Sequence, residues 1–240
     1  MRAVLIALVL LAGCGEPEPA SESESESESE SESESESGGL RGPRGQPAVI
    51  CSGPPDDPGQ IDLYASAALE GNLSGSIEGL EALCGAHPAS STARVRLGEL
   101  LLRTQPPRAE EASRWFDRAL ELHEQGCTLG YRDHWAALQG RALSRMVRGD
   151  YANAIPPLRE SIRRWPQVRA THYNLACALC QTDDLDGCAD ELETVLGELD
   201  GPDFLADQTR PAEQYRTMIR ADPDLDPIRR DAERMRRLSL

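Results

Sequence analysis

From about Asp57 onward, apolar and polar residues follow one another with helical spacing. Apolar residues recur three and four positions apart, and runs of β-branched residues are few. A clear example follows Gly149, where Ala154, Leu158 and Ile162 occur at steps of four residues. This periodicity is typical of amphipathic helices and not of strands. The pattern therefore predicts an all-α fold.

The helical pattern itself repeats along the chain with a period of about 34 residues. Equivalent positions in the three other copies carry these residues: Leu73, Ser76, Leu80 and Cys84; Ala109, Ala112, Phe116 and Leu120; Leu185, Cys188, Leu192 and Leu196. We expect helix pairs at 57–90, 91–126, 135–168 and 169–202, with an extra segment at 127–134 between the second and third. Because one helix pair buries too little surface alone, at least three must stack into a solenoid.

The repeats resemble the tetratricopeptide repeat (TPR) family. The first helices carry Leu97-Gly98 and Leu175-Ala176, which match the signature of the first TPR helix. The resemblance covers 57–202. It implies a TPR-like helical-repeat solenoid of about four to five helix pairs, in which residues 203–240 form a degenerate repeat with capping helices. Two residues depart from the pattern: Tyr64 occupies a normally small position and Arg141 a normally apolar one.

The first thirteen residues predict a signal peptide. Arg2 precedes an apolar run over residues 3–10, and small residues follow it. The run is about half of the ~20 residues that a membrane-spanning helix needs. Leu11-Ala12-Gly13-Cys14 resembles the lipobox of bacterial lipoproteins, in which the cysteine thiol takes a diacylglyceryl group. This resemblance implies lipid attachment at Cys14 and permanent tethering of the exported protein to a membrane.

Residues 14–56 are predicted to be a disordered tether. Residues 21–37 alternate strictly between Ser and Glu, and a stretch rich in Pro and Gly follows. Such a segment has no apolar side chains to bury and should stay disordered and extended. It also carries much of the formal net charge of −16. The preferred role is a spacer; binding of cations or of a basic partner is the alternative. A basic stripe for nucleic acid is absent from the sequence.

Six cysteines follow Cys14, and in an exported protein an even number favours disulfides. Six cysteines allow fifteen connectivities. Cys177, Cys180 and Cys188 are grouped, so they are candidates for a disulfide or for structural thiols. A zinc site that recruits His172, or a redox-active Cys177–Cys180 pair, are the alternatives.

Motifs for catalysis are missing from the sequence. It contains no Gly-x-Ser-x-Gly, no His-Glu-x-x-His and no phosphate-binding Gly-rich loop. The four histidines are scattered, and Asp222, Asp224 and Asp226 lack the rest of a calcium loop. The sequence therefore predicts no enzyme, no cofactor and no resident metal ion.

The TPR resemblance implies a concave groove, lined by the first helix of each repeat, that binds a protein or peptide partner. The expected groove residues are Val95, Glu99, Leu102, Arg103, Gln139, Leu143, Met146, Val147 and Tyr173, with Cys177 and Cys180 beside them. The mixture is mostly apolar, which suits an amphipathic helix or an extended peptide. In the alternative arrangement, the fifth segment folds back and fills part of this face.

Together these features predict a membrane-tethered TPR lipoprotein of the bacterial envelope that acts as a non-enzymatic interaction scaffold or adaptor. A thiol redox or metal-handling protein built on Cys177, Cys180 and Cys188 is the alternative, and an accessory subunit of an enzyme is another. Gly15 follows Cys14 where some bacteria place an Asp to retain lipoproteins in the inner membrane. This difference favours the outer membrane.

Overall fold

The computed structural model describes residue 51 and residues 58–199 and 211–240. The predicted signal peptide, the lipobox Cys14 and the Ser/Glu tether lie outside the described residues, as does segment 200–210. The described residues form helices and contain no strand. The all-α prediction is therefore confirmed.

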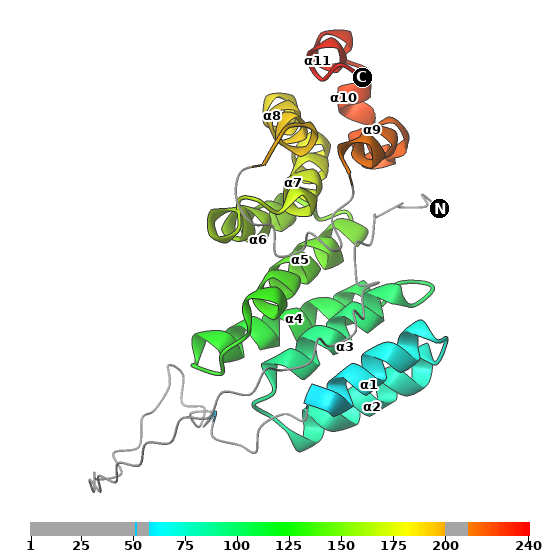
Figure 1. Cartoon of the computed structure of the whole chain (residues 1–240), viewed down its shortest axis with the longest axis vertical. Helices are drawn as coiled ribbons and strands as arrows, with labels where there is room; N and C mark the ends of the chain where they lie inside the picture. The colour runs from blue at the N-terminus through cyan, green and yellow to red at the C-terminus, as the bar shows by residue number, and fades with distance from the viewer. Residues whose placement is uncertain (1–50, 52–57, 200–210) are drawn as a thin grey trace, which may run out of the picture.

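Helices α1 to α8 form four consecutive antiparallel hairpins that stack on one another (Figure 1). Their bounds are α1 (Pro58–Leu69), α2 (Leu73–Ala86), α3 (Ser91–Arg103), α4 (Ala109–Glu124), α5 (Tyr131–Val147), α6 (Tyr151–Arg164), α7 (Arg169–Gln181) and α8 (Leu185–Leu196). Each helix contacts the one before it and the one after it. One continuous hydrophobic cluster runs through the stack from Ile61 to Leu238.

The segment between the second and third hairpins is shorter than the sequence suggested. Helix α5 begins at Tyr131, four residues before the expected start of the third repeat at 135. Only a short connection over residues 125–130 remains between α4 and α5. Cys127 in this connection is bonded to Cys51. The bounds expected for the extra segment, 127–134, are therefore corrected, because residues 131–134 form the first turn of α5.

The turns inside three hairpins each contain one residue with a positive φ angle. Gly71 and Gly149 adopt positive φ angles of 103° and 78°, and Asp183 stands at the equivalent place with φ 64°. A positive φ reverses the chain direction in few residues, and glycine adopts it without steric cost. Asn72 and Asp184 follow directly and cap the second helices by accepting hydrogen bonds from backbone N–H groups.

A buried aromatic ring joins the second and third hairpins. The ring of Phe116 on α4 is fully buried and lies against Gly98 on α3 and Gly140 on α5. A Cβ atom built on Gly98 would lie 2.7 Å from the ring, and one built on Gly140 would lie 2.1 Å from it. Both glycines therefore leave the space that Phe116 fills.

The two departures from the TPR pattern are both compensated by a neighbour. Tyr64 on α1 packs against Gly79 on α2, where a Cβ atom would come within 2.2 Å of the tyrosine ring. The small residue of this helix crossing is thus on the opposite helix. Arg141 on α5 forms an ion pair with Asp117 on α4, with the arginine Nε 2.6 Å from the carboxylate.

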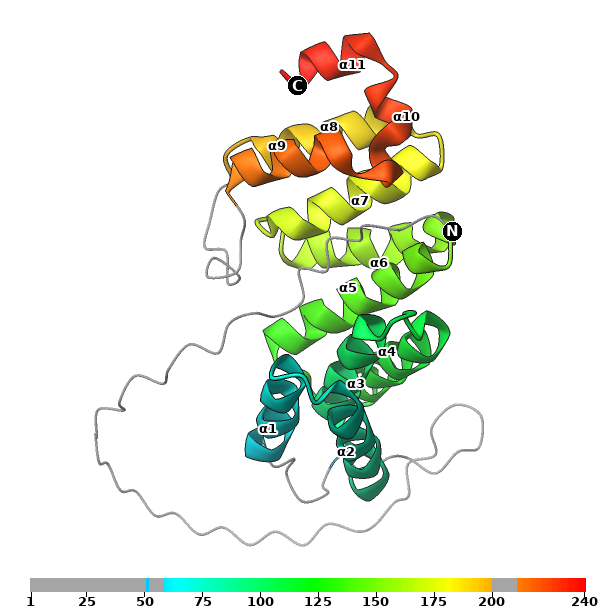
Figure 2. The same ribbon diagram turned by 90° about the vertical axis from the view of Figure 1, so that its right-hand side faces the viewer.

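The described C-terminal residues, 211–240, form a cap on the fourth hairpin. It comprises α9 (Ala212–Ala221), the 3-10 turn η1 (Pro223–Leu225), α10 (Asp226–Arg229) and α11 (Ala232–Arg237). Figure 2 shows α9 lying alongside α8, with α10 and α11 beyond it. Tyr215, Ile219, Leu225 and Ile228 are buried in this cap. The cap therefore covers apolar surface that the fourth hairpin would otherwise expose.

Candidate interaction surface

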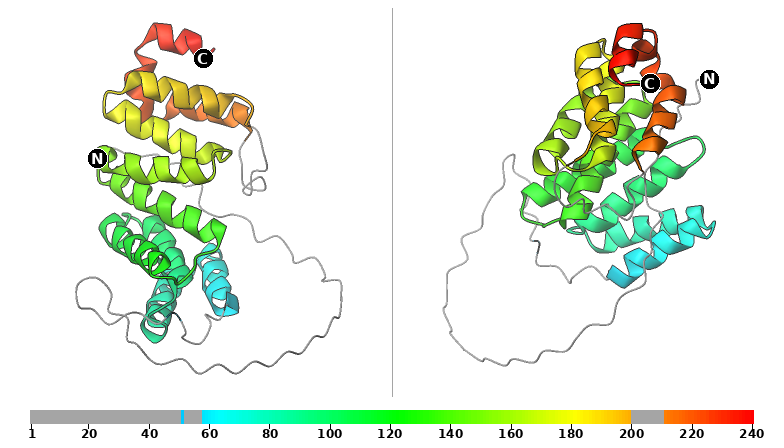
Figure 3. Two further views of the ribbon diagram at one scale, coloured as in Figure 1. Left: turned by 90° about the vertical axis from the view of Figure 1, so that its left-hand side faces the viewer. Right: turned by 45° about the horizontal axis from the view of Figure 1, so that its top comes forward.

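The first helices of the hairpins define one face of the solenoid. Helix α3 contacts α1 and α5, and α5 also contacts α7, so each first helix touches the first helix of the next hairpin. The second helices chiefly contact the first helices on either side of them. Stacked hairpins curve toward the helices that lie closer together, so we refer to the side formed by the first helices as the concave face. Figure 3 shows the stack from two further sides.

The predicted groove residues lie on these first helices, but most of them are buried. Val95, Glu99, Leu102, Gln139, Leu143, Met146 and Tyr173 are at most 4% exposed. Arg103 and Val147 are half-buried. The expectation that all nine line an open, exposed groove is therefore wrong, and their contact with a partner stays a prediction.

Apolar packing accounts for the larger share of this burial. Val95, Leu102, Leu143, Met146 and Tyr173 all belong to the continuous hydrophobic cluster that runs through the hairpins. Core residues of this kind contribute to folding and are costly to replace. The repeat register placed them on the correct helices but could not show how far each one is covered.

Gln139 can be buried because both the nitrogen and the oxygen of its amide form hydrogen bonds with the next first helix, α7. Its Nε2 donates to the Thr171 hydroxyl at 2.7 Å, and its Oε1 accepts from the Asn174 amide at 2.9 Å. The Trp135 indole N–H donates to the same Thr171 hydroxyl at 3.0 Å. These bonds link α5 to α7 and satisfy polar groups that would otherwise be costly to bury.

Glu99 forms the charged centre of a second network, between α3 and α5. It accepts from Arg96 at 3.0 Å, and Arg96 also donates to Asp133 on α5 at 2.7 Å. Burial raises the pKa of Glu99, while the Arg96 guanidinium acts in the opposite direction. The second carboxylate oxygen, Oε1, is buried and has no hydrogen-bond partner among the described residues.

The C-terminal cap covers the concave face of α7. The Tyr173 hydroxyl donates to Asp222 at 2.7 Å, and its ring lies 5.5 Å from the Tyr215 ring. Tyr151 donates to the Asp224 carboxylate, and Gln181 donates to the Asp224 backbone carbonyl. The alternative in which the fifth segment fills part of the face is therefore correct for the fourth hairpin.

Sequence reasoning missed the roles of Asp222 and Asp224 in this contact. The sequence showed only that they lack the rest of a calcium loop. In the structure, Asp222 caps the next turn by accepting a hydrogen bond from the Asp224 backbone N–H at 3.0 Å. Both side chains are nevertheless buried and accept from tyrosines far away in the sequence. The alternation of Asp with Pro was the available signal, since it marks a segment with a fixed backbone and repeated acceptors.

The grouped cysteines form a disulfide and a buried thiol. Cys180 on α7 is bonded to Cys188 on α8, whereas Cys177 lies buried outside both disulfides. Burial, together with Asp222 and Asp224, raises the pKa of Cys177 well above its ordinary value. A raised pKa disfavours the nucleophilic thiolate. The Cys177–Cys180 pair expected of a redox-active motif is therefore not formed.

Both ring nitrogens of His172 already have hydrogen-bond partners. Its Nδ1 lies 2.6 Å from the Glu191 carboxylate and its Nε2 lies 2.8 Å from the Pro166 carbonyl oxygen. Within the described ranges, no group of three or more His, Cys, Asp or Glu side chains could hold a metal ion.

Two other histidines stack beside the connection between α4 and α5. The His123 and His134 rings lie 4.3 Å apart, and His134 meets the Trp165 ring edge-on at 5.4 Å. The Leu129 backbone N–H donates to His123 Nδ1 at 3.0 Å. Burial lowers the pKa of His134 to about 4, and the nearby His123 and Arg164 act in the same direction.

We expect His134 to make the protein less stable in acid. Its folded pKa of about 4 lies below the unfolded value of about 6.5, so the unfolded chain binds the proton first. Stability should fall as the pH drops from about 6.5 to about 4. A shift of about 2.5 pKa units corresponds to at most about 3.5 kcal/mol, and solvent screening of this partly covered ring reduces the expected loss to roughly 2 kcal/mol. Urea unfolding between pH 4 and pH 8 measures this loss. His134→Phe should flatten the profile, and His87→Gln, outside this cluster, should not; equal profiles for wild type and His134→Phe would contradict the assignment.

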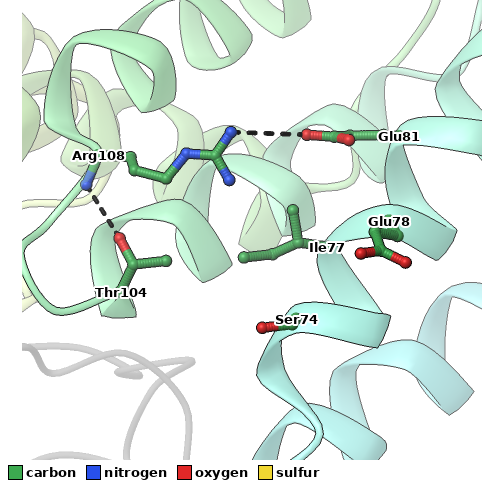
Figure 4. A pocket seen from close by; sticks show the side chains of 6 residues that line it. All are labelled: Ser74, Ile77, Glu78, Glu81, Thr104 and Arg108. Atoms are coloured by element: carbon green, nitrogen blue, oxygen red, sulfur yellow. Dashed lines mark hydrogen bonds and ion pairs between the residues drawn. The ribbon is translucent and has the colours of Figure 1, made fainter.

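A polar pocket of about 300 Å³ lies between α2 and the turn that joins α3 to α4 (Figure 4). It is lined by Ser74, Ile77, Glu78, Glu81, Thr104 and Arg108. Arg108 lies 3.8 Å from Glu81 and pairs more closely with Glu111, at 2.8 Å. The lining holds no nucleophile paired with a base, so it gives no support to a catalytic function.

None of the helices in the described part of the chain is long and apolar enough to cross a membrane. The anchoring segment expected from the sequence, 1–14, belongs to the residues that are not described.

The stacked hairpins, their curvature and their glycine-mediated helix crossings define a TPR-like helical-repeat fold. No protein-family model matches the chain, and no curated protein matches it. Among solved structures, it is similar to MamA 41-end from Desulfovibrio magneticus RS-1, with a TM-score of 0.51 and 16% identity over 75% of this chain and 93% of that chain. It is also similar to the MamA RS-1 ArsTM double mutant, with a TM-score of 0.50 and 14% identity over 75% of this chain and 94% of that chain. MamA contains TPRs, and at this level of identity the likeness establishes the fold alone.

Proposed function

We propose that this protein is a non-enzymatic scaffold that binds a protein or peptide partner on its concave face. The observation that carries the proposal is the solenoid itself, in which first helices from successive hairpins form one curved face. Surfaces of this kind suit extended peptides and amphipathic helices. The cap already covers α7, and most of the predicted groove residues on α3 and α5 are buried. The partner's place is therefore at the half-buried residues of these two helices, such as Arg103 and Val147.

We also propose that the protein is exported and tethered to the cell envelope through a lipid on Cys14, with the outer membrane favoured. The lipobox and signal-peptide pattern support this assignment. Two disulfides in the folded part, Cys51–Cys127 and Cys180–Cys188, add an independent argument. Structural disulfides persist in oxidising compartments and are rare in the cytosol.

A protein partner fits the surface better than a nucleic acid does. The arginines near the C-terminus form the densest basic group, but Arg234 pairs with Asp186 and Arg237 pairs with Asp190 on α8. Their charge is thus largely compensated within the chain. The overall charge of −16 would in addition repel a phosphate backbone.

Two half-buried positions on the concave face offer a test of partner binding. Arg103 lies at the end of α3 and Val147 at the end of α5. The double variant Arg103→Glu with Val147→Glu should abolish co-purification of the partner from cells and lower the melting temperature by only a few degrees. Both side chains reach solvent, but Arg103 donates to the Ala68 carbonyl oxygen at 3.4 Å and Val147 packs against the core. The expected cost is therefore small but measurable.

A matched control keeps the charge change the same on the opposite side. Arg114→Glu with Ile155→Glu places the same two substitutions on the second helices α4 and α6, at an exposed arginine and a half-buried aliphatic residue. This variant should keep the partner. Partner loss with the control variant, or retention with the concave-face variant, would contradict the proposed surface.

The anchor is tested by Cys14→Ser. Without the thiol that accepts the lipid, the exported protein should lose its acyl-dependent attachment and appear in the soluble fraction or as an uncleaved precursor. Fractionation after a high-salt wash, with immunoblotting, distinguishes these outcomes from the wild type. A mature-sized Cys14→Ser protein that stays with washed membranes would overturn the lipid assignment.

A further inference from the structure

The disulfide Cys51–Cys127 joins the chain before the first helix to the middle of the solenoid. Cys51 precedes α1, and Cys127 lies in the connection between α4 and α5, with a sequence separation of 76 residues. The Sγ of Cys51 also lies 3.9 Å from the backbone carbonyl oxygen of Gln125. Helices α1 to α4 thus lie inside one covalently closed loop.

This closed loop changes the path of a force applied through the N-terminus. A pull on the chain before Cys51 passes across the disulfide to Cys127 and continues directly into α5. The two hairpins α1–α2 and α3–α4 are left outside the path between the N-terminal segment and the C-terminus. Without the disulfide, the same pull would act first on α1.

Helix α1 is the element that such a pull would most easily remove. It packs on α2 and α3, and as the end of the stack it has a neighbouring hairpin on one side only (Figure 2). Its Leu63 and Leu69 side chains are 65% and 45% exposed. Terminal repeats with few buried contacts open at lower free energy than the centre of a solenoid.

We propose that the Cys51–Cys127 disulfide is a mechanical clasp, which transfers tension from the N-terminal tether to the α4–α5 connection and keeps the first two hairpins unloaded. The proposed lipid anchor supplies the source of that tension in the cell. The clasp itself follows from the described disulfide and the order of the helices. It would keep the concave surface of α3 intact while the protein is held at a membrane.

Single-molecule force spectroscopy tests the clasp directly. The non-acylated full chain, carrying Cys14→Ser, is pulled between handles at its N-terminus and C-terminus. It is compared with the same chain carrying Cys51→Ser and Cys127→Ser. Loss of the clasp should lengthen the fully unfolded chain by about 260 Å, from 76 residues at roughly 3.3–3.6 Å each. It should also add an early, low-force event that releases α1 and α2.

The short-loop disulfide Cys180–Cys188 serves as the control for this measurement. Removing the Cys180–Cys188 disulfide, with a separation of 8 residues, should lengthen the chain by only about 30 Å and add no early event. Equal unfolded lengths with and without Cys51 and Cys127, or the early low-force event in the clasped protein, would overturn the proposal. Because the handles replace the lipid, this result is independent of whether Cys14→Ser changes membrane fractionation.

Discussion

Gly140→Ala is expected to lower the free energy of unfolding by about 2 kcal/mol, although alanine is normally the better helix residue. The alanine Cβ would lie 2.1 Å from the Phe116 ring, which is fully buried and cannot swing away. Overpacking of a core costs roughly 1–3 kcal/mol, and repacking around a rigid ring falls at the upper end. The gain in helix propensity, about 1 kcal/mol, offsets only part of this cost. Thermal melting and urea unfolding of the purified protein measure the loss.

Two further variants separate overpacking from other effects of the substitution. Gly85→Ala lies in α2, where nothing would lie within 4 Å of the new Cβ atom, so it should leave stability unchanged or raise it by up to about 1 kcal/mol. In a Phe116→Leu background, which opens space beside Gly140, the cost of Gly140→Ala should shrink. If Gly140→Ala is as stable as Gly85→Ala, the close packing of α4 against α5 is wrong.

Removing the Cys51–Cys127 disulfide should produce the largest loss of stability, about 4.5 kcal/mol. A cross-link lowers the entropy of the unfolded chain, and the effect grows with the logarithm of the loop length. The loop here spans 76 residues and holds two complete hairpins. Urea unfolding of Cys51→Ser with Cys127→Ser, compared with the wild type under non-reducing conditions, gives the difference in free energy.

The second disulfide provides the comparison for this prediction. Cys180 and Cys188 close a loop of only 8 residues, for which the same relation gives about 2.5 kcal/mol. The long-loop variant should therefore be the less stable of the two. A loss below about 1 kcal/mol for the Cys51 and Cys127 pair would mean that the unfolded chain is not constrained by this bond.

The hairpins could be predicted from sequence because their causes are local and repeated. Apolar spacing gives each helix, and turn residues such as Gly149 end it. The period then shows that the hairpins stack. The departure at Tyr64 also has a local cause, because Gly79 on the other helix of the same hairpin provides the space for the tyrosine ring. The sequence pattern compares equivalent positions between repeats, whereas this exchange of large and small residues occurs between two helices of one repeat.

The state of the concave face could not be predicted, because it depends on contacts between distant segments. Tyr173 is buried by Asp222 and Tyr215, which follow it by more than forty residues. Repeat register gives the helix face on which Tyr173 lies but says nothing of what packs on that face. Cysteine pairing is unpredictable for the same reason, since fifteen connectivities fit the sequence and the fold selects among them.

Site-specific photo-crosslinking in intact cells tests the concave face most directly. A photoreactive amino acid is placed at Arg103 or Val147 on the first helices, and at Arg114 or Arg163 on the second helices as controls. We expect one protein partner to be captured from both concave positions and from neither control. Capture of the same partner at Arg114 and Arg163, with none at Arg103 and Val147, would contradict this expectation.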